Sequence, residues 1–289
     1  MKKKNNTTNK KLASAASMLL LSTAMLGMAT YAWFTMNKEV SVTGMKVEAT
    51  ASEGLVISGD NKSTWLTDWD VAMTGGVKLY PTSTDGAANN TAWAVAYSDD
   101  FNDADKDTPA SGYTDLNMQY TTSGTYGGVT FGSGEGVGYA VKGSGTNDTQ
   151  NYVLKKTFYI KSTADNPIQS GLKIKSVTAT ASGGSGSDNI NKALRVLAIV
   201  NNGGTKVATI YDPIVTDDDA IKFKNTTSIT LNDGTSVGDA IGSSIGNTDG
   251  TAVQVDVYMF YDGEDQNCKS ANITGIDVDT LNIGLKFTY

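Results

Sequence analysis

The sequence predicts an all-β protein built as a two-sheet sandwich, and three observations lead to this prediction. Beyond residue 40, apolar residues recur at every second position in segment after segment, which is the period of a half-buried strand. Glycine accounts for 31 of the 289 residues, which is typical of a chain with many turns. No amphipathic helical pattern alternates with the strands. We therefore expect a sandwich of jelly-roll topology with long decorated loops.

The first expected strand begins near Val40. Val40 and Val42 alternate with polar residues, and the phase of the alternation shifts at Gly44, as it does at a β-bulge. A stretch rich in Gly, Ser, Thr, Asn and Asp follows, and we expect a loop-rich insertion with short strands at about 60–148. Because no proline-rich or strongly charged linker divides the chain, residues 33–289 are expected to form a single domain.

The clearest strands lie in the second half of the chain. An apolar run at 194–200, the turn Asn201-Asn202-Gly203-Gly204, and a second strand at 206–211 are typical of a β-hairpin. Alternating apolar residues predict further strands at 152–160, 172–180, 253–261 and 281–289.

The composition removes several classes of catalytic site. The chain has no histidine and one cysteine, so it cannot build a Ser-His-Asp triad, an HExxH zinc site or an intrachain disulfide. It also lacks a P-loop, a GxGxxG motif after a strand and a GxSxG elbow. We predict a protein that is not an enzyme and has no resident cofactor. A glycosidase that uses two carboxylates stays open, because a sequence does not show which acids face each other.

The charge is strongly uneven along the chain. The net charge is -7, and the first 32 residues contain five lysines and no acid, so the remainder carries -7 - 5 = -12. An acidic surface repels phosphate backbones, which argues against nucleic acid as a partner. Arg195 is the only arginine, so no guanidinium cluster is available for binding phosphate.

The N-terminus predicts export. A lysine-rich start is followed by small and apolar residues from Leu12 to Phe34, which is the pattern of a secretory signal peptide over residues 1–32. We expect cleavage between Ala32 and Trp33, a secreted or cell-surface product, and membrane contact only during export. The alternative is a retained anchor, because this stretch is long enough to span a bilayer. A type IV pilin is disfavoured because its apolar helix would follow the processing site, whereas here the stretch Met36-Asn37-Lys38-Glu39 is largely polar.

Residues around this cleavage site resemble a known family. The segment Met28-Ala29-Thr30-Tyr31-Ala32-Trp33-Phe34-Thr35, followed by a Val-rich strand, is similar to the start of TasA/camelysin proteins, secreted Firmicutes proteins with a dedicated (SipW-type) signal peptide. Residues 257–268 and the last strand also look similar, while the rest of the chain matches by pattern only. The resemblance implies a jelly-roll subunit of a pilus-like extracellular filament in a biofilm matrix, processed by a dedicated signal peptidase. Camelysin has been classed as a metalloprotease, but this chain has no imidazole to hold zinc.

The new N-terminus would form an assembly strand. After cleavage the chain begins Trp33-Phe34-Thr35-Met36, in which three of the four residues are apolar. Val40 and Val42 follow a few residues later. An apolar extended segment must be covered, and a sheet edge of another copy would pair its backbone. If each copy donates its N-terminal strand to the next copy, the contacts do not form a closed ring, and a homopolymer results. The alternative is that the segment is the first strand of its own core.

One acidic loop has the spacing of a cation site. Asp103, Asp105 and Asp107 repeat the spacing of the first ligands of an EF-hand, but Thr108 stands where the turn glycine belongs and Thr114 where the bidentate glutamate belongs. Two interpretations stay open, a calcium-binding loop and a solvated acidic loop.

Aromatic residues in the insertion support a competing function. If exposed, they would stack on sugars, as in a monomeric secreted or cell-surface adhesion module that binds carbohydrate or a host glycoprotein; if buried, they form a satellite core. These residues are Trp65, Trp69, Trp93, Tyr97, Tyr113, Tyr120, Tyr126 and Tyr139. Cys268, in a polar turn, either joins two subunits or is a half-covered thiol.

Overall fold

The computed structural model describes most of the chain beyond residue 39. The described residues are 40–42, 45–72, 77–97, 112–121, 125–126, 129–130, 135–141, 149–182, 192–214, 220–224, 227–234, 238–265, 268, 277–278 and 280–289. Within them the protein is all-β with several sheets, and the one helical element is the 3-10 turn η1 (Asp249–Thr251). No helix long and apolar enough to cross a membrane occurs in these ranges.

The larger sheet has seven strands, and four of them coincide with predicted ones. Every strand pairing within it is antiparallel. In spatial order the strands are β16 (Thr205–Tyr211), β15 (Leu194–Asn202), β19 (Val253–Tyr261), β13 (Thr149–Ser162), β12 (Glu135–Val141) and β9 (Gln119–Thr121), with β3 (Leu55–Ser58) also paired to β13.

The predicted hairpin is confirmed. Asn202 pairs with Thr205 across the two-residue turn of Gly203 and Gly204. Both glycines have positive φ, at 60° and 90°, which is the backbone of a type I′ turn and explains why glycine stands at both positions.

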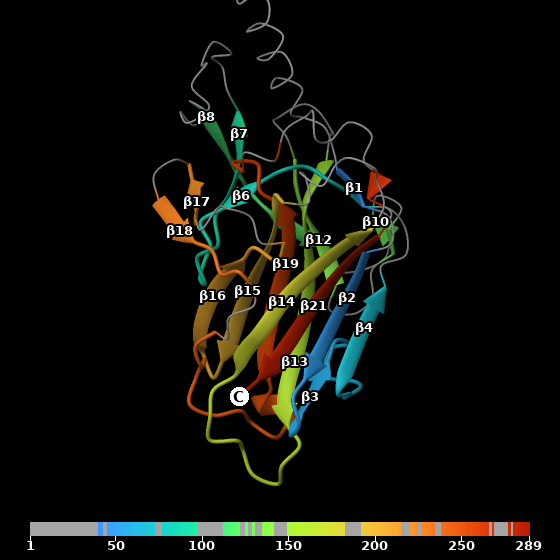
Figure 1. Cartoon of the computed structure of the whole chain (residues 1–289), viewed down its shortest axis with the longest axis vertical. Coiled ribbons are helices and arrows are strands. Elements are labelled where there is room, and N and C mark those ends of the chain that lie inside the picture. The colour runs from blue at the N-terminus through green and yellow to red at the C-terminus, as the bar shows by residue number, and fades with distance from the viewer. Residues whose placement is uncertain are drawn as a thin grey trace, which may run out of the picture.

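The second sheet lies in front of the first in Figure 1. Its strands, in spatial order, are β14 (Lys173–Ser182), β21 (Thr280–Thr288), β2 (Met45–Ala51) and β4 (Asp68–Ala72). β2 runs parallel to β21, whereas the other two pairings are antiparallel. The sequence indicated three of these strands but not β4.

The main core fills the space between the two sheets. On β19 the alternate side chains from Val253 to Met259 are buried against Ile283, Leu285 and Phe287 of β21, all at most 2% exposed. The rings of Phe158 and Phe287, from opposite sheets, have their centroids 6.5 Å apart. Because both sheets contribute alternate residues to one cluster, they form the face-to-face arrangement of a β-sandwich.

One side of the sandwich is covered by irregular backbone at 232–234 and 238–245. It bonds to β16 at its start, through the N–H of Asn232 and the carbonyl of Ile210 (2.9 Å), and then to β14, whose Val177 N–H donates to Gly234 (2.8 Å). Gly234 has φ +74°, and a Cβ there would lie 2.2 Å from the Val177 carbonyl oxygen. Glycine is therefore required where this segment turns from one sheet to the other.

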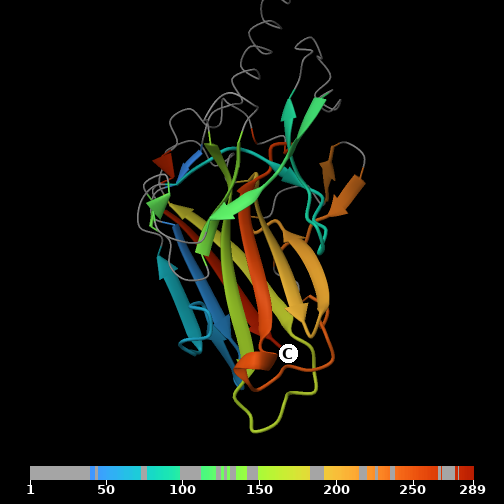
Figure 2. The ribbon, with the colours of Figure 1, turned by 180° about the vertical axis from the view of Figure 1, so that it is seen from behind.

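The outer face of the larger sheet is partly covered by a small sheet, as Figure 2 shows from behind. This sheet contains β6 (Ser83–Thr84), β7 (Trp93–Tyr97) and β8 (Gly112–Leu116). Trp93 is 3% exposed and packs edge-on against Phe260 at 5.2 Å between ring centroids. A second apolar cluster is thereby formed on the reverse side of β19.

Three small groups of strands complete the described fold. They are β1 (Val40–Val42) between β20 (Asp277–Val278) and β5 (Val77–Leu79), the pair β10 (Thr125–Tyr126) and β11 (Val129–Thr130), and the pair β17 (Ala220–Phe223) and β18 (Thr227–Thr230). In Figure 1, β1 lies at the end of the sandwich opposite the C-terminus.

The core predicts a large difference between two neighbours on β21. Phe287→Ala removes a ring that is 0% exposed, and the resulting cavity should lower the free energy of unfolding by about 3–5 kcal/mol. Lys286→Ala, at an exposed position on the other face, should change it by less than about 0.5 kcal/mol. Urea unfolding followed by tryptophan fluorescence measures both values, and equal losses would contradict the assignment of the core.

Candidate functional site

The structure describes two of the five residues of the predicted assembly strand. Val40 and Val42 lie in β1, which pairs antiparallel with β5 on one side and parallel with β20 on the other. Trp33, Phe34 and Met36 lie outside the described residues, as does the cleavage site at Ala32. The backbone of β1 is therefore occupied on both edges by its own chain.

The predicted calcium residues also lie outside the described part. Asp103, Asp105 and Asp107 fall in the range 98–111, which the structure does not describe. Among the residues that it does describe, no three carboxylates or thiols come together in a group that could hold a metal ion.

The described aromatic residues of the insertion mostly pack against other elements. Trp93 is buried in the second apolar cluster, and Tyr120 stacks edge-on with Tyr258 at 5.8 Å between centroids. Trp69 packs against the main core, and a Cβ at Gly59 would lie 2.4 Å from its indole nitrogen. Trp65 lies under the ammonium of Lys161 (4.1 Å to the ring centroid). The satellite-core interpretation is confirmed for Trp93.

Cys268 is more deeply buried than the sequence suggested. Its side chain is 1% exposed and belongs to the main core. Burial raises the pKa of the thiol, so the group stays protonated and unreactive. A disulfide between subunits through Cys268 would require the core to open.

Within the described ranges four strands are outermost in the two main sheets: β16 and β9 in the larger sheet, and β14 and β4 in the second. β16 has a bridge to Asn232 at its end, and β14 forms backbone hydrogen bonds with Gly234 and Gly238. β4 has β2 on one side and no described strand on the other. On β4, Asp68 and Asp70 are exposed, whereas Trp69 turns toward the core. Exposed acids protect an edge from non-specific pairing but leave its backbone groups available.

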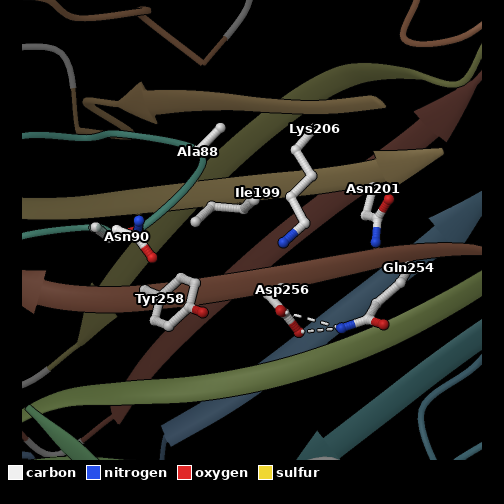
Figure 3. Close-up of a pocket in the computed structure, with 9 residues that line it drawn as sticks. Ala88, Asn90, Ile199, Asn201, Lys206, Gln254, Asp256 and Tyr258 are labelled. Carbon is white, nitrogen blue, oxygen red and sulfur yellow. Dashed lines mark hydrogen bonds between the residues drawn. The ribbon is translucent and has the colours of Figure 1, made fainter. Parts of the chain in front are cut away.

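A polar cavity of about 320 Å³ opens on the outer face of the larger sheet, beside the second apolar cluster (Figure 3). It is called the outer-face cavity below. Its floor comes from three adjacent strands and consists of Ile199, Asn201, Lys206, Gln254, Asp256 and Tyr258. These residues share one face because they alternate with the core residues along β15, β16 and β19.

The wall of the outer-face cavity is the loop 85–92, which contributes Ala88, Asn90 and Thr91. The carboxylate of Asp85 accepts hydrogen bonds from the N–H groups of Ala87 (3.1 Å) and Ala92 (2.9 Å), which ties together the two ends of the loop. The Thr91 hydroxyl donates to the carbonyl of Ala87 at 2.7 Å. The wall is therefore fixed by its own hydrogen bonds.

Among the described residues, Asp256 is the one carboxylate that lines the outer-face cavity. It accepts hydrogen bonds from the Thr157 hydroxyl (2.6 Å) and from the Gln254 amide (3.1 Å to Oδ2), and the Lys155 ammonium lies 3.4 Å away. Burial, followed by the charge of Asp256, raises the pKa of Tyr258, so the tyrosine hydroxyl remains protonated.

A separate cluster of charged groups is buried where the larger sheet meets the small outer sheet. Arg195 is 0% exposed, forms an ion pair with Asp265, and lies 3.5 Å from the carboxylate of Asp212. Asp262 accepts hydrogen bonds from the Ser83 hydroxyl and from the Glu264 N–H. Arg195 thus balances carboxylates from the segments that follow β19 and β16, and Asp262 joins β6 to the end of β19.

Asp262 has a strongly raised pKa. Burial raises its pKa to about 7, against the opposing effects of the Ser83 hydrogen bond and the Arg195 charge. Such a shift also occurs in catalytic acids, but Asp262 is 0% exposed and does not line the outer-face cavity. Its contacts join β6 to the end of β19.

Sequence reasoning did not identify the residues of the outer-face cavity. Lys206, Gln254 and Asp256 were recognised only as the polar partners in alternating strands, and the loop 85–92 as part of the insertion. Their one sequence signal is that Gln254 and Asp256 are unusually polar for the outer face of a central strand.

No protein-family model matches this chain, and no curated protein is significantly similar to it. The resemblance to TasA/camelysin proteins stays a prediction from residues 28–35 and from the C-terminal strands. What the chain does is therefore inferred from its own residues and their geometry.

Asp262 predicts a distinct pH dependence of stability. Between its ordinary pKa of 3.8 and the folded value of about 7, the unfolded chain loses this proton while the folded protein keeps it. The free energy of unfolding should therefore fall by roughly 1.4 kcal/mol per pH unit as the pH rises through this window, and the contribution should level off above it. Asp262→Asn has no such proton and should lack this slope.

Urea unfolding between pH 4 and pH 8 measures how the free energy of unfolding changes with pH in the wild type and in Asp262→Asn. Asp239→Asn makes the same change in net charge at an exposed position and should keep the wild-type slope. Identical slopes in the wild type and in Asp262→Asn would show that the buried carboxyl does not titrate in this window.

Proposed function

We propose that this chain is an exported, non-enzymatic structural subunit of an extracellular fibre or biofilm matrix. In this proposal a dedicated signal peptidase removes residues 1–32, the rest folds as a sandwich of jelly-roll type, and the N-terminal segment is donated to the next copy. The observation that supports assembly is the edge of β4, which has no strand on its outer side among the described residues. An added strand would extend the four-stranded sheet there.

The pairing of β1 defines which residues would be donated. Because β1 is bonded on both sides by its own chain, Val40 and Val42 serve as the anchor, and residues 33–39 are the donated part. Seven extended residues span about 23 Å, which is enough to cover the five-residue β4.

The chemistry of this segment matches the edge of β4. Phe34 and Met36 lie on one side of an extended chain and would pack beside Trp69, which turns toward the core. The freed α-amino group and Lys38 are positive, with one negative charge at Glu39, and they would lie near the exposed Asp68 and Asp70. Backbone hydrogen bonds would supply affinity, and the side chains would set the register.

Removal of the donated segment should abolish the fibres. Mature protein that begins at Trp33 is expected to form filaments in negative-stain electron microscopy, whereas protein that begins at Val40 should remain monomeric in light scattering. Phe34→Ser with Met36→Ser should behave like the truncation, because polar side chains would be buried, while Thr35→Ser should assemble normally. Filaments formed without residues 33–39 would contradict strand donation.

Cysteine cross-linking tests the acceptor edge. Thr35 and Asp70 both face away from the core in the proposed pairing, so Thr35→Cys with Asp70→Cys should yield disulfide-linked oligomers on oxidation. Thr35→Cys with Val207→Cys, on the edge of β16, should not. The native Cys268 is buried and contributes no background. Denaturing gels without reductant measure the products, and equal cross-linking at both edges would contradict the choice of β4.

A further inference from the structure

We propose that the outer-face cavity binds a neutral saccharide. This inference does not depend on fibre assembly, because the cavity lies on a sheet face of a single copy and its lining residues are distinct from β4 and from residues 33–39. Its volume of about 320 Å³ is at the lower end of the range of small-molecule sites, so it would hold a short segment of a sugar chain.

The lining groups offer the hydrogen bonds that sugar hydroxyls require. Asn90, Asn201 and Gln254 present amides, each of which both donates and accepts. The Tyr258 hydroxyl and the Lys206 ammonium point into the space between the strands and the loop in Figure 3. A sugar hydroxyl also donates and accepts, so vicinal hydroxyls match a set of amides, a hydroxyl and a carboxylate.

One of these groups is buried without a partner. The Oδ1 atom of Asn201 is enclosed by protein and has no hydrogen-bond donor among the described residues. Because this oxygen is enclosed, a ligand would reach Asn201 through its amide nitrogen, which points toward Gln254 in Figure 3. The nitrogen of an amide donates a hydrogen bond, so Asn201 would bind a ligand oxygen.

The charges favour a neutral ligand. Asp256 is already compensated by Lys155, Thr157 and Gln254. In the part of the chain that the structure describes, Lys206 is the one cation that lines the cavity. A single lysine is a weak basis for binding a phosphate or a polyanion. The chain without residues 1–32 carries -12, so it would repel acidic polymers over a long range.

The site is also preorganised. Its floor consists of three hydrogen-bonded strands of the larger sheet, and Ile199 and Tyr258 supply an apolar base, at 8% and 9% exposed. Asn90 has φ 55°, in the left-handed region that asparagine tolerates best after glycine, which fixes the direction of its side chain. A rigid site loses little conformational entropy on binding.

Isothermal titration calorimetry of the mature protein with soluble hexasaccharides tests the proposal. The neutral probes are cellohexaose, laminarihexaose, maltohexaose and N-acetylchitohexaose, and hexagalacturonate is the acidic probe. We expect at least one neutral hexasaccharide to bind with a micromolar to millimolar Kd, and Asn201→Ala and Lys206→Ala to weaken that binding at least tenfold. Asn282→Ala, which removes an exposed amide from the outer face of the other sheet, should bind like the wild type.

Several outcomes would overturn the proposal. The first is that none of the neutral hexasaccharides binds at millimolar concentration. The second is that only hexagalacturonate binds. The third is that both cavity variants bind with the affinity of the wild type. Because Lys206 is exposed, Lys206→Ala should fold even if Asn201→Ala does not, and the melting temperature of each variant checks this. Protein that begins at Val40 should bind the sugar as well as the longer chain does, so loss of fibres and loss of sugar binding are separate results.

Discussion

The fold depends on burying both faces of one central strand, β19. Its odd-numbered residues enter the core between the sheets, while Tyr258 and Phe260 pack under Trp93 on the other face. A strand covered on both sides fixes the register of its neighbours, since a shift by one residue would exchange the two sets of side chains. The small outer sheet, the loop 85–92 and the buried ion pairs of Arg195 all occupy positions set by this register.

The same constraint explains where polar groups are tolerated. Coverage by the small sheet extends over only part of β19, and Gln254 and Asp256 lie beyond it, on the open part of the face. At the covered end, the charges are neutralised in place, as Arg195 does for Asp265. Lys156 shows the same principle within the core, because its ammonium bonds to Glu135 at 3.1 Å and to the carbonyl of Gly59 at 2.9 Å.

Much of the strand content could be predicted from the two-residue period, but strand neighbours and the cavity could not. The hairpin around Gly203, the strand at 253–261 and the last strand were recognisable because each carries its own apolar alternation and turn residues. β4 was missed because it is only five residues long, so the alternation of Trp69 and Val71 with Asp68 and Asp70 is too short to stand out within the loop-rich insertion. The cavity was missed because Asn90, Lys206 and Asp256 come from three separate segments that only the folded sheet brings together.

The parallel pairing of β2 with β21 has a mechanical consequence. Seven residue pairs, from Met45 with Leu281 to Ala51 with Phe287, run side by side in the same direction. A pulling force applied ahead of β2 and behind β21 acts along the strands in opposite directions, so it loads all the hydrogen bonds of this ladder in shear at once. The ladder cannot open one bond at a time like a zipper, and the domain should therefore resist stretching between its two ends.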